Sequence, residues 1–300
     1  MPEVTFIPDQ RTIDVKAGQT LLQAALKAGI PHTHACGGSA RCTTCRVLVT
    51  AGAGNCSDPT WKETRIVRKL GFNQSFRLAC QTKVQGDMTV RRLVLDPADV
   101  ALTDARDRPV PVGDERNVAV LFCDIRSFTP LAEELLPYDV IHLLNRFHHD
   151  MTGAIRGQGG IVTSYMGDGL MALFGAQETV ADPPLQAVMA GLDMLAALDA
   201  RKAELVAIYG ASFDIGIGIH CGPAVVGHLG GQAAILTAIG DVVNVASRIE
   251  GANKELGTRL LVSEDVYNAV AEHITVAAHA RMVLKGKTGT FTLTEVTGRR

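Results

Sequence analysis

The chain has 300 residues and a formal net charge of −2, with 47% hydrophobic and 20% charged residues. It is too long for one small domain, fits two, and has the composition of a chain that folds around hydrophobic cores. The near-neutral charge argues against a nucleic-acid partner, and no apolar run reaches the roughly 20 residues needed to span a bilayer. Seven cysteines in a chain that starts without a secretory signal favour a reducing environment. We therefore expect a soluble, cytoplasmic protein.

The first domain is expected over residues 1–95, followed by a linker over 96–116. Thr20 is suited to cap a short helix that Gly29 ends, and strand-like segments of β-branched and apolar residues flank this helix. The linker is rich in aspartate and proline, a composition that favours an extended path. The predicted elements of the first domain are strands at 4–7 and 12–15, a helix at 21–28 and a strand at 46–50.

The second domain, expected over 117–300, alternates strands and helices. Its first segment is a continuous apolar run, as expected for a strand buried on both faces. Pro137 is expected to separate two helices, and Asp182 to cap a third. The predicted elements are a strand at 117–123, a helix from 129, a helix ending at 157, a hairpin over 161–174, a helix after 182, a strand at 213–220, a helix at 242–256, a strand at 259–262 and a short helix after 263.

Four cysteines are spaced like the ligands of a metal centre. Three of them lie on a glycine-containing loop, where small residues let backbone amides approach and hydrogen-bond the sulfurs. Buried structural thiols and a zinc site are the alternatives, although zinc sites usually have two close cysteine pairs and this chain has one. A Rieske centre would need histidine ligands, and His32 and His34 do not have that spacing, so they are interpreted as ordinary loop residues. The four cysteines are Cys36, Cys42, Cys45 and Cys80.

This segment resembles the [2Fe-2S] ferredoxins of β-grasp fold over residues 3–95. Five residues separate Cys36 from Cys42, which is similar to the adrenodoxin-type and bacterial branch rather than to the plant-type spacing. The resemblance implies a [2Fe-2S] cluster on the four cysteines and an electron donor that the sequence does not identify. Cys123 and Cys221 lie outside the pattern and are expected to be small packing residues.

Two aspartates and a polar helix face predict a phosphoryl-transfer site. Asp124 ends the predicted buried strand, and Asp168 lies at the tip of the predicted hairpin. Carboxylates at neighbouring strand ends can bind Mg²⁺ or Mn²⁺, which prefer oxygen ligands and also bind phosphates. Asn244 and Arg248 are four residues apart on a predicted helix and therefore share a face. A guanidinium suits a charged phosphoryl group, and an asparagine can orient a ribose.

These segments resemble the catalytic domain of the class III nucleotidyl cyclases over about residues 115–297. The motifs that carry the resemblance are 122–129, 167–168, 174–175, 216–220, the helix with Asn244 and Arg248, and 284–287. The resemblance implies an α+β protein whose cyclase domain has a ferredoxin-like βαββαβ core and binds two Mg²⁺ or Mn²⁺ ions per active site. The implicated residues are Asp124, Asp168 and the Ile125 backbone for the metals, Ser127, Phe128, Thr129 and Lys285 for the phosphates, and Asn244 and Arg248 for catalysis.

In this family, one protomer supplies the metal aspartates and its partner supplies the asparagine, arginine and lysine. The resemblance therefore implies a homodimer with active sites at the subunit interface. The implied reaction is in-line attack of the ribose 3′-oxygen of ATP on the α-phosphorus, with release of pyrophosphate. One metal ion would lower the pKa of the 3′-hydroxyl, the other would gather the β- and γ-phosphates, and Arg248 would neutralise charge on the α-phosphoryl group.

Two positions bear on the choice of base. Thr237 fits a bacterial adenylyl variant of the family, and its hydroxyl can hydrogen-bond a purine edge. Ser164 stands where the adenylyl form has lysine, and the glutamate and cysteine of the guanylyl form are both absent. ATP is therefore the expected substrate, with GTP or relaxed purine selectivity as the alternative.

The pairing of the two domains predicts redox control of the cyclase. Reduction would add one negative charge to the cluster, which could alter how the first domain docks on the cyclase dimer. The rival interpretation is an electron carrier whose second domain binds nucleotide without turnover. A flavin or nicotinamide oxidoreductase is disfavoured because no G-x-G-x-x-G motif follows a predicted strand.

Overall fold

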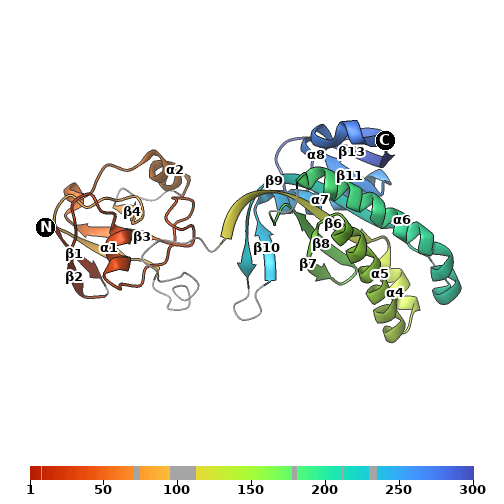
Figure 1. The fold of residues 1–300 in the computed structure, drawn as a ribbon, viewed down its shortest axis with the longest axis horizontal. Coiled ribbons are helices and arrows are strands. Elements are labelled where there is room, and N and C mark those ends of the chain that lie inside the picture. The colour runs from red at the N-terminus through yellow and green to blue at the C-terminus, as the bar shows by residue number, and fades with distance from the viewer. Residues whose placement is uncertain (8, 71–74, 95–112, 178–180, 211, 230–234) are drawn as a thin grey trace. The chain divides into compact units, whose positions relative to one another are not determined.

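The computed structural model describes residues 1–7, 9–70, 75–94, 113–177, 181–210, 212–229 and 235–300. The chain separates into two compact units, Met1–Asp114 and Glu115–Arg300, and each contains its own sheet (Figure 1). Most of the predicted linker lies outside the described residues, and its last residues, from Gly113, belong to a strand. The domain limits drawn from the sequence stay a prediction. None of the described helices is long and apolar enough to span a membrane.

The first unit is built on a five-stranded sheet. Its elements are β1 (Glu3–Ile7), β2 (Arg11–Asp14), α1 (Leu21–Lys27), β3 (Arg46–Ala51), the 3₁₀ helix η1 (Ala53–Asn55), α2 (Trp61–Leu70), β4 (Phe76–Leu78) and β5 (Met88–Arg92). The strand order is β2-β1-β5-β3-β4, with β1 antiparallel to β2 and parallel to β5. The predicted strands at 4–7, 12–15 and 46–50 are thus confirmed to within one residue at every boundary, whereas α2, β4 and β5 were not predicted.

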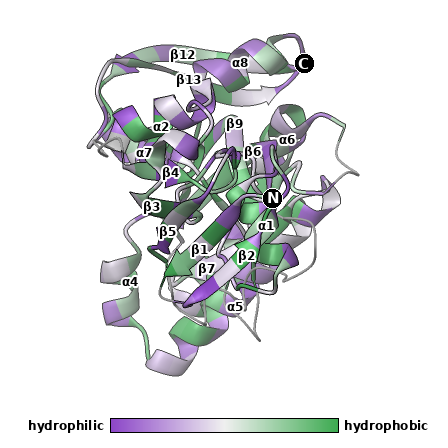
Figure 2. Ribbon diagram, turned by 90° about the vertical axis from the view of Figure 1, so that its left-hand side faces the viewer, coloured by the Kyte–Doolittle hydropathy of each residue, from purple (hydrophilic) through white to green (hydrophobic). Residues whose placement is uncertain are grey.

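Helix α1 forms where the sequence predicts it, for the predicted reason. Thr20 and Gln23 form a capping box in which each side chain accepts a hydrogen bond from the other residue's backbone. Beyond the helix end, Gly29 has a φ of +66°, which an L-residue rarely adopts. The apolar face of α1 packs on core strands such as β3, which is green in Figure 2. The Leu22 amide donates 2.9 Å to the Ala79 carbonyl, so α1 is held directly beside the segment that carries Cys80.

The second unit is an eight-stranded sheet with helices on both faces. Its elements are β6 (Gly113–Ile125), α4 (Phe128–Glu134), α5 (Pro137–Gly157), β7 (Ile161–Met166), β8 (Gly169–Phe174), α6 (Pro183–Tyr209), β9 (Ile215–Leu229), β10 (Ile235–Ile239), α7 (Asp241–Leu256), β11 (Leu260–Ser263), α8 (Glu264–Val270), the 3₁₀ helix η3 (Ala271–His273), β12 (Ile274–Met282) and β13 (Phe291–Arg299). The strand order is β12-β13-β11-β9-β6-β8-β7, and β10 pairs with β9.

Strand β6 is buried on both faces, as its apolar run predicts. Leu121 and Cys123 belong to the hydrophobic cluster that includes α5 and α6, which lie side by side in Figure 1. Val118 and Val120 belong to a second cluster on the opposite face, which includes residues of α7. The burial of Cys123, and the partial burial of Cys221 against the first cluster, confirm their interpretation as packing residues.

Strand β9 is longer than predicted. The sequence indicated a strand over 213–220, but β9 has 15 residues and continues to Leu229. Its first half pairs with β11 and its second half with β10, so Pro223 lies at the change of partner, where a missing amide is tolerated. The hairpin of β9 and β10 has a buried face and an exposed face. The exposed apolar row consists of Val225, Leu229, Ile235 and Ile239.

Candidate functional sites

The structure brings Asp124 and Asp168 together at one end of the sheet. Asp124 is the penultimate residue of β6, and Asp168 lies in the two-residue turn between β7 and β8. The antiparallel pairing of β6 with β8 sets Cys123 opposite Leu170, so the hairpin tip reaches the end of β6. The two carboxyl groups lie within hydrogen-bond reach. Burial, and then the charge of Asp168, raises the pKa of Asp124 to about 6.

A third carboxyl group, that of Glu250 on α7, adds to the negative charge at this point. Burial, followed by the charge of Asp124, raises the pKa of Glu250 to about 7. The Arg126 guanidinium opposes both shifts but supplies one positive charge against three carboxyl groups. The excess negative charge and the oxygen donors of Asp124 and Asp168 fit a divalent cation.

Within the described ranges, no cluster of three or more histidine, cysteine or acidic side chains forms a metal-binding group. The candidate cation site therefore offers two carboxylates, which suits Mg²⁺, because Mg²⁺ usually takes one or two carboxylates and completes its shell with water and phosphate. Glu250 and Arg126 were not singled out from the sequence. In the sequence, each is a charged residue next to apolar residues. Many surface positions have the same neighbours, so this pattern does not indicate a site.

Two glycines of β9 let α7 lie directly on the sheet. A Cβ on Gly216 would stand 2.3 Å from Nη2 of Arg126 and 2.7 Å from Oε1 of Glu250. A Cβ on Gly218 would stand 2.1 Å from the backbone nitrogen of Glu250, so no side chain fits between helix and strand at this crossing. The glycines thereby fix the position of α7 relative to the sheet.

Asn244 and Arg248 share the exposed face of α7, as predicted. The alternate face buries Val245 and Ile249. In the part of the chain that the structure describes, no hydrogen bond or ion pair joins Asn244 or Arg248 to either aspartate. Within one chain, the two halves of the predicted active site are therefore not assembled into a single bonded cluster.

The predicted phosphate contacts lie at the start of α4 and in the loop between β12 and β13. Ser127 precedes α4 with a φ of +54°, and no side chain caps this helix, which begins with Phe128 and Thr129. Backbone amides at such a start are free to bind an anion. Lys285 is exposed between β12 and β13, where the neighbouring Lys287 pairs with Asp241. Of these two lysines, Lys285 has no ion pair among the described residues.

The two predicted base-selecting residues lie on strands that are in contact. Ser164 is a half-buried residue of β7, opposite Met171 of β8. Thr237 belongs to β10, opposite Gly227 of β9, and β10 contacts β7. Thr237 lies on the same side of the hairpin as the exposed apolar row.

The four predicted cluster cysteines form two pairs. The thiol of Cys36 hydrogen-bonds that of Cys42, which lowers the pKa of Cys36 and raises the pKa of Cys42. The thiol of Cys45 hydrogen-bonds that of Cys80 in the same way, lowering the pKa of Cys80 and raising that of Cys45. Two thiol pairs fit a centre with two irons, each held by two sulfurs, and the described residues show no single group of three ligands that would fit one zinc ion.

The surroundings of the cysteines supply donors to the sulfurs. The Thr44 hydroxyl lies 3.2 Å from the Cys42 sulfur, and the Gln81 amide donates to the Cys80 sulfur at 3.4 Å. His32 and His34 precede the loop and are both buried, with exposed fractions of 2% and 1%. Burial lowers the pKa of His32 to about 4, so this side chain is neutral near pH 7.

Comparisons with known proteins identify the two units. Residues 110–295 match the family described as adenylate and guanylate cyclase catalytic domain, and residues 4–85 match the family described as 2Fe-2S iron-sulfur cluster binding domain. The chain belongs to the family of class III adenylate and guanylate cyclases, and it carries an N-terminal ferredoxin-type domain. The expected fold class, a ferredoxin-type domain followed by an α+β cyclase domain, is confirmed.

Individual relatives include cyclases of both base specificities. An adenylate cyclase from Anabaena cylindrica is 38% identical over 162 residues, which cover 52% of this chain and 31% of that protein. The crystal structure of the guanylyl cyclase Cya2 aligns with a TM-score of 0.58 and 30% identity over 63% of this chain and 95% of that one. The adenylyl cyclase CyaB from P. aeruginosa aligns with a TM-score of 0.57 and 26% identity over 62% and 96%. The chain thus spans about a third of the length of the Anabaena relative.

Proposed function

We propose that this chain is a nucleotidyl cyclase that converts ATP into 3′,5′-cyclic AMP and pyrophosphate. The observation that carries the proposal is the adjacency of Asp124 and Asp168, whose mutual repulsion a divalent cation would relieve. Membership of the cyclase family supports the reaction class, and Thr237 favours ATP over GTP. We place the protein in the cytoplasm, because reducing conditions there keep cysteine thiols available as ligands.

Each chemical task of the proposed reaction has a candidate residue in this chain. Asp124, Asp168 and the Ile125 carbonyl would hold two Mg²⁺ or Mn²⁺ ions. Such ions supply charge neutralisation for a triphosphate and lower the pKa of a bound hydroxyl. The backbone amides at Ser127 to Thr129 would bind phosphate oxygens at the start of α4.

The remaining groups are proposed to come from a second copy of the chain. Asn244 would orient the ribose, Arg248 would neutralise charge that develops on the α-phosphoryl group, and Lys285 would bind the terminal phosphates. These side chains are exposed and unpaired in the described residues, as groups that wait for a partner site would be. The exposed apolar row on β9 and β10 supports a homodimer, because a second copy would remove it from water.

The substrate is tested by incubating the purified full chain with ATP or GTP and with Mg²⁺ or Mn²⁺. Chromatography of the products should show cyclic AMP and pyrophosphate, and Asp124→Ala should abolish both. Cyclic GMP from GTP alone would establish the guanylate alternative. If the wild-type chain binds nucleotide but forms no product, the alternative would be favoured, namely an electron carrier with a non-catalytic nucleotide-binding domain.

We further propose that Cys36, Cys42, Cys45 and Cys80 hold a [2Fe-2S] cluster whose oxidation state controls the cyclase rate. The support is the arrangement of the four thiols in two pairs and the match of this segment to 2Fe-2S domains. The test compares the cyclase rates of oxidised and dithionite-reduced protein under anaerobic conditions. Equal rates in the two states would leave the cluster without a regulatory role.

A further inference from the structure

Helix α2 presents a basic face to solvent. We define the basic face by five exposed residues that share one side of the helix: Trp61, Lys62, Arg65, Arg68 and Lys69. Trp61 is 69% exposed, and its ring lies 5.8 Å from the Lys62 ammonium and 5.7 Å from the Arg65 guanidinium carbon. In the ranges that the structure describes, none of the four cations pairs with a carboxylate. A large aromatic side chain amid unpaired charges of one sign is typical of a binding surface.

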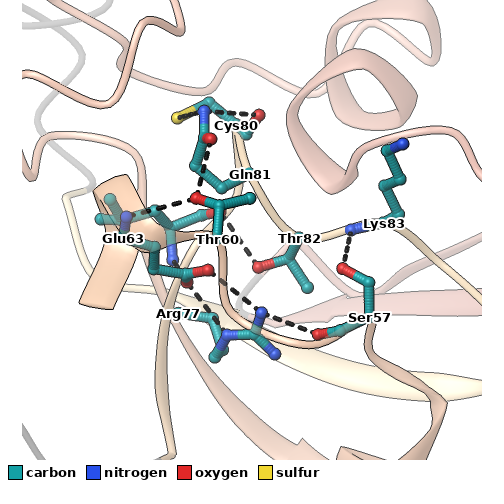
Figure 3. Close-up of polar contacts among 9 residues, drawn as sticks. Ser57, Thr60, Glu63, Arg77, Cys80, Gln81, Thr82 and Lys83 are labelled. Carbon is teal, nitrogen blue, oxygen red and sulfur yellow. Dashed lines mark hydrogen bonds and ion pairs between the residues drawn. The ribbon is translucent and has the colours of Figure 1, made fainter. Parts of the chain in front are cut away.

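The opposite side of α2 is anchored through a buried ion pair. The side chain of Glu63 is 1% exposed, and Arg77 donates to its two oxygens at 3.0 and 3.1 Å (Figure 3). The Leu78 amide also donates to Glu63, at 2.7 Å. Three charge-assisted hydrogen bonds therefore hold α2 against β4, and the basic face has a fixed orientation.

Hydrogen bonds also connect the start of α2 to a proposed cluster ligand. The Thr60 hydroxyl accepts from the Glu63 amide at 3.2 Å and donates to the Gln81 side-chain oxygen at 3.1 Å. The Gln81 amide in turn donates to the sulfur of Cys80 (Figure 3). The basic face thus begins next to Thr60, which two successive hydrogen bonds connect to the Cys80 sulfur.

We propose that the basic face is the docking surface through which a one-electron carrier protein with an acidic surface reduces the cluster. The inference rests on the proposed cluster. One electron leaves the carrier and enters the cluster, with no bond made or broken. The chain as a whole carries −2, so the positive charge is local to α2 and matches an acidic patch of similar size. Trp61 supplies the aromatic anchor that such interfaces use.

The experiment measures electron transfer to the full chain in the cluster-loaded state. The probe is reduced flavodoxin, an acidic one-electron carrier, and the signal is the bleaching of the cluster absorbance after stopped-flow mixing. The test variant is R65E/R68E. The matched control is R11E/K16E, which makes the same charge change beside β2, the sheet edge opposite β4.

At low ionic strength, we expect R65E/R68E to lower the second-order rate constant by about tenfold or more, and the difference to shrink as salt is added. The control should change the rate constant by less than about twofold, because its charges are not at the docking surface. Trp61→Ala, which keeps the charge, should lower the rate constant at every salt concentration. Unchanged cluster absorbance in all variants establishes that they are folded and loaded.

Equal losses in R65E/R68E and R11E/K16E would overturn the proposal, because only net charge would matter. A faster reaction in R65E/R68E would also overturn it, since the positive charges would then hinder the acidic carrier instead of attracting it. If R65E/R68E no longer binds anionic phospholipid vesicles but keeps the wild-type rate constant with flavodoxin, the basic face would be assigned to a membrane surface instead. If the wild-type chain has no chromophore that dithionite bleaches, then it holds no cluster. The proposed cluster would then fail, and this outcome is distinguishable from a failure of the docking surface alone.

Discussion

The carboxyl groups of Asp124 and Asp168 lie within hydrogen-bond reach of each other, although one belongs to the penultimate residue of β6 and the other to a hairpin turn. Two carboxylates so close repel when both are ionised, and burial adds to the cost for Asp124. A protein tolerates such a pair where a cation or a shared proton compensates for it. This relationship makes the metal-free protein sensitive to pH in a direction that can be measured.

Asp124→Asn should stabilise the metal-free protein at high pH. The pKa of Asp124 is raised to about 6 in the native state, so the native state binds this proton more tightly than the unfolded chain does. Above pH 6 the ionised group destabilises the native state, and asparagine removes that penalty. Discounted for the half-exposed site, we expect a gain of about 1 kcal/mol at pH 8, or roughly 2–4 °C in Tm. The gain should shrink as the pH falls through 6 and disappear near pH 4.

Calorimetry in EDTA checks this prediction, with the transition of the cyclase unit followed from pH 4 to 8. Glu133→Gln is the matched control, because Glu133 is an exposed carboxylate on α4. The control should change Tm little at any pH. A destabilised Asp124→Asn variant at pH 8 would mean that the two carboxyl groups do not repel.

Mixing two inactive variants should restore activity if the active site is shared between subunits. Asp124→Ala removes a proposed metal ligand and Arg248→Ala removes the proposed guanidinium, so each homodimer lacks one part of both sites. A heterodimer keeps one intact site, and random exchange makes half of the dimers heterodimers. We therefore expect up to about a quarter of the wild-type rate after mixing. No recovery, with subunit exchange shown by differently tagged chains, would place each site within one chain.

Gln81→Leu should lower the reduction potential of the cluster. The Gln81 amide donates to the sulfur of Cys80 at 3.4 Å, and such a bond stabilises the reduced, more negative cluster. Loss of a hydrogen bond worth about 1 kcal/mol corresponds to roughly 40 mV for a one-electron couple. Spectroelectrochemical titration measures the shift. Gln85→Leu, at an exposed position of the same segment, should leave the potential unchanged.

Glu63→Gln should destabilise the first unit strongly. The variant leaves the Arg77 guanidinium buried without its countercharge, which costs about 3 kcal/mol or more. Denaturation with guanidinium chloride, followed by the cluster absorbance, measures the loss of unfolding free energy. Glu3→Gln removes an exposed carboxylate from β1 and should change the stability by less than about 0.5 kcal/mol. Equal stabilities of the two variants would show that the Glu63 ion pair does not hold the unit together.

The sequence was sufficient where a local pattern determines an element. The capping box of α1, the prolines that begin α5 and α6, and the turn at Gly167 and Asp168 each predict a boundary that the structure has. Helix α2 was harder to recognise, because its inner side combines the buried Glu63 carboxylate with Ile66, which packs on the core. A charged residue is usually read as exposed, so Glu63 obscured the inner side of this helix in the sequence.

The candidate sites follow the same division. Asp124, Asp168 and the four cysteines could be proposed because their residue types and spacing suit particular chemistry. The position of Glu250 beside Asp124 could not, because it depends on how closely α7 approaches β9 at Gly216 and Gly218. That approach is a tertiary contact between segments that are distant in sequence. The pairing of the thiols likewise required the folded loop.

The backbone contact between α7 and Gly218 also bears on how an enzyme of this kind is switched. With no side chain between helix and strand, there is nothing at that crossing to repack, and α7 is expected to travel with the sheet as one rigid body. In the proposed homodimer, Arg248 could then approach or leave the substrate only when one whole protomer turns against the other. A rotation of that kind would open or close two symmetric catalytic centres at the same time.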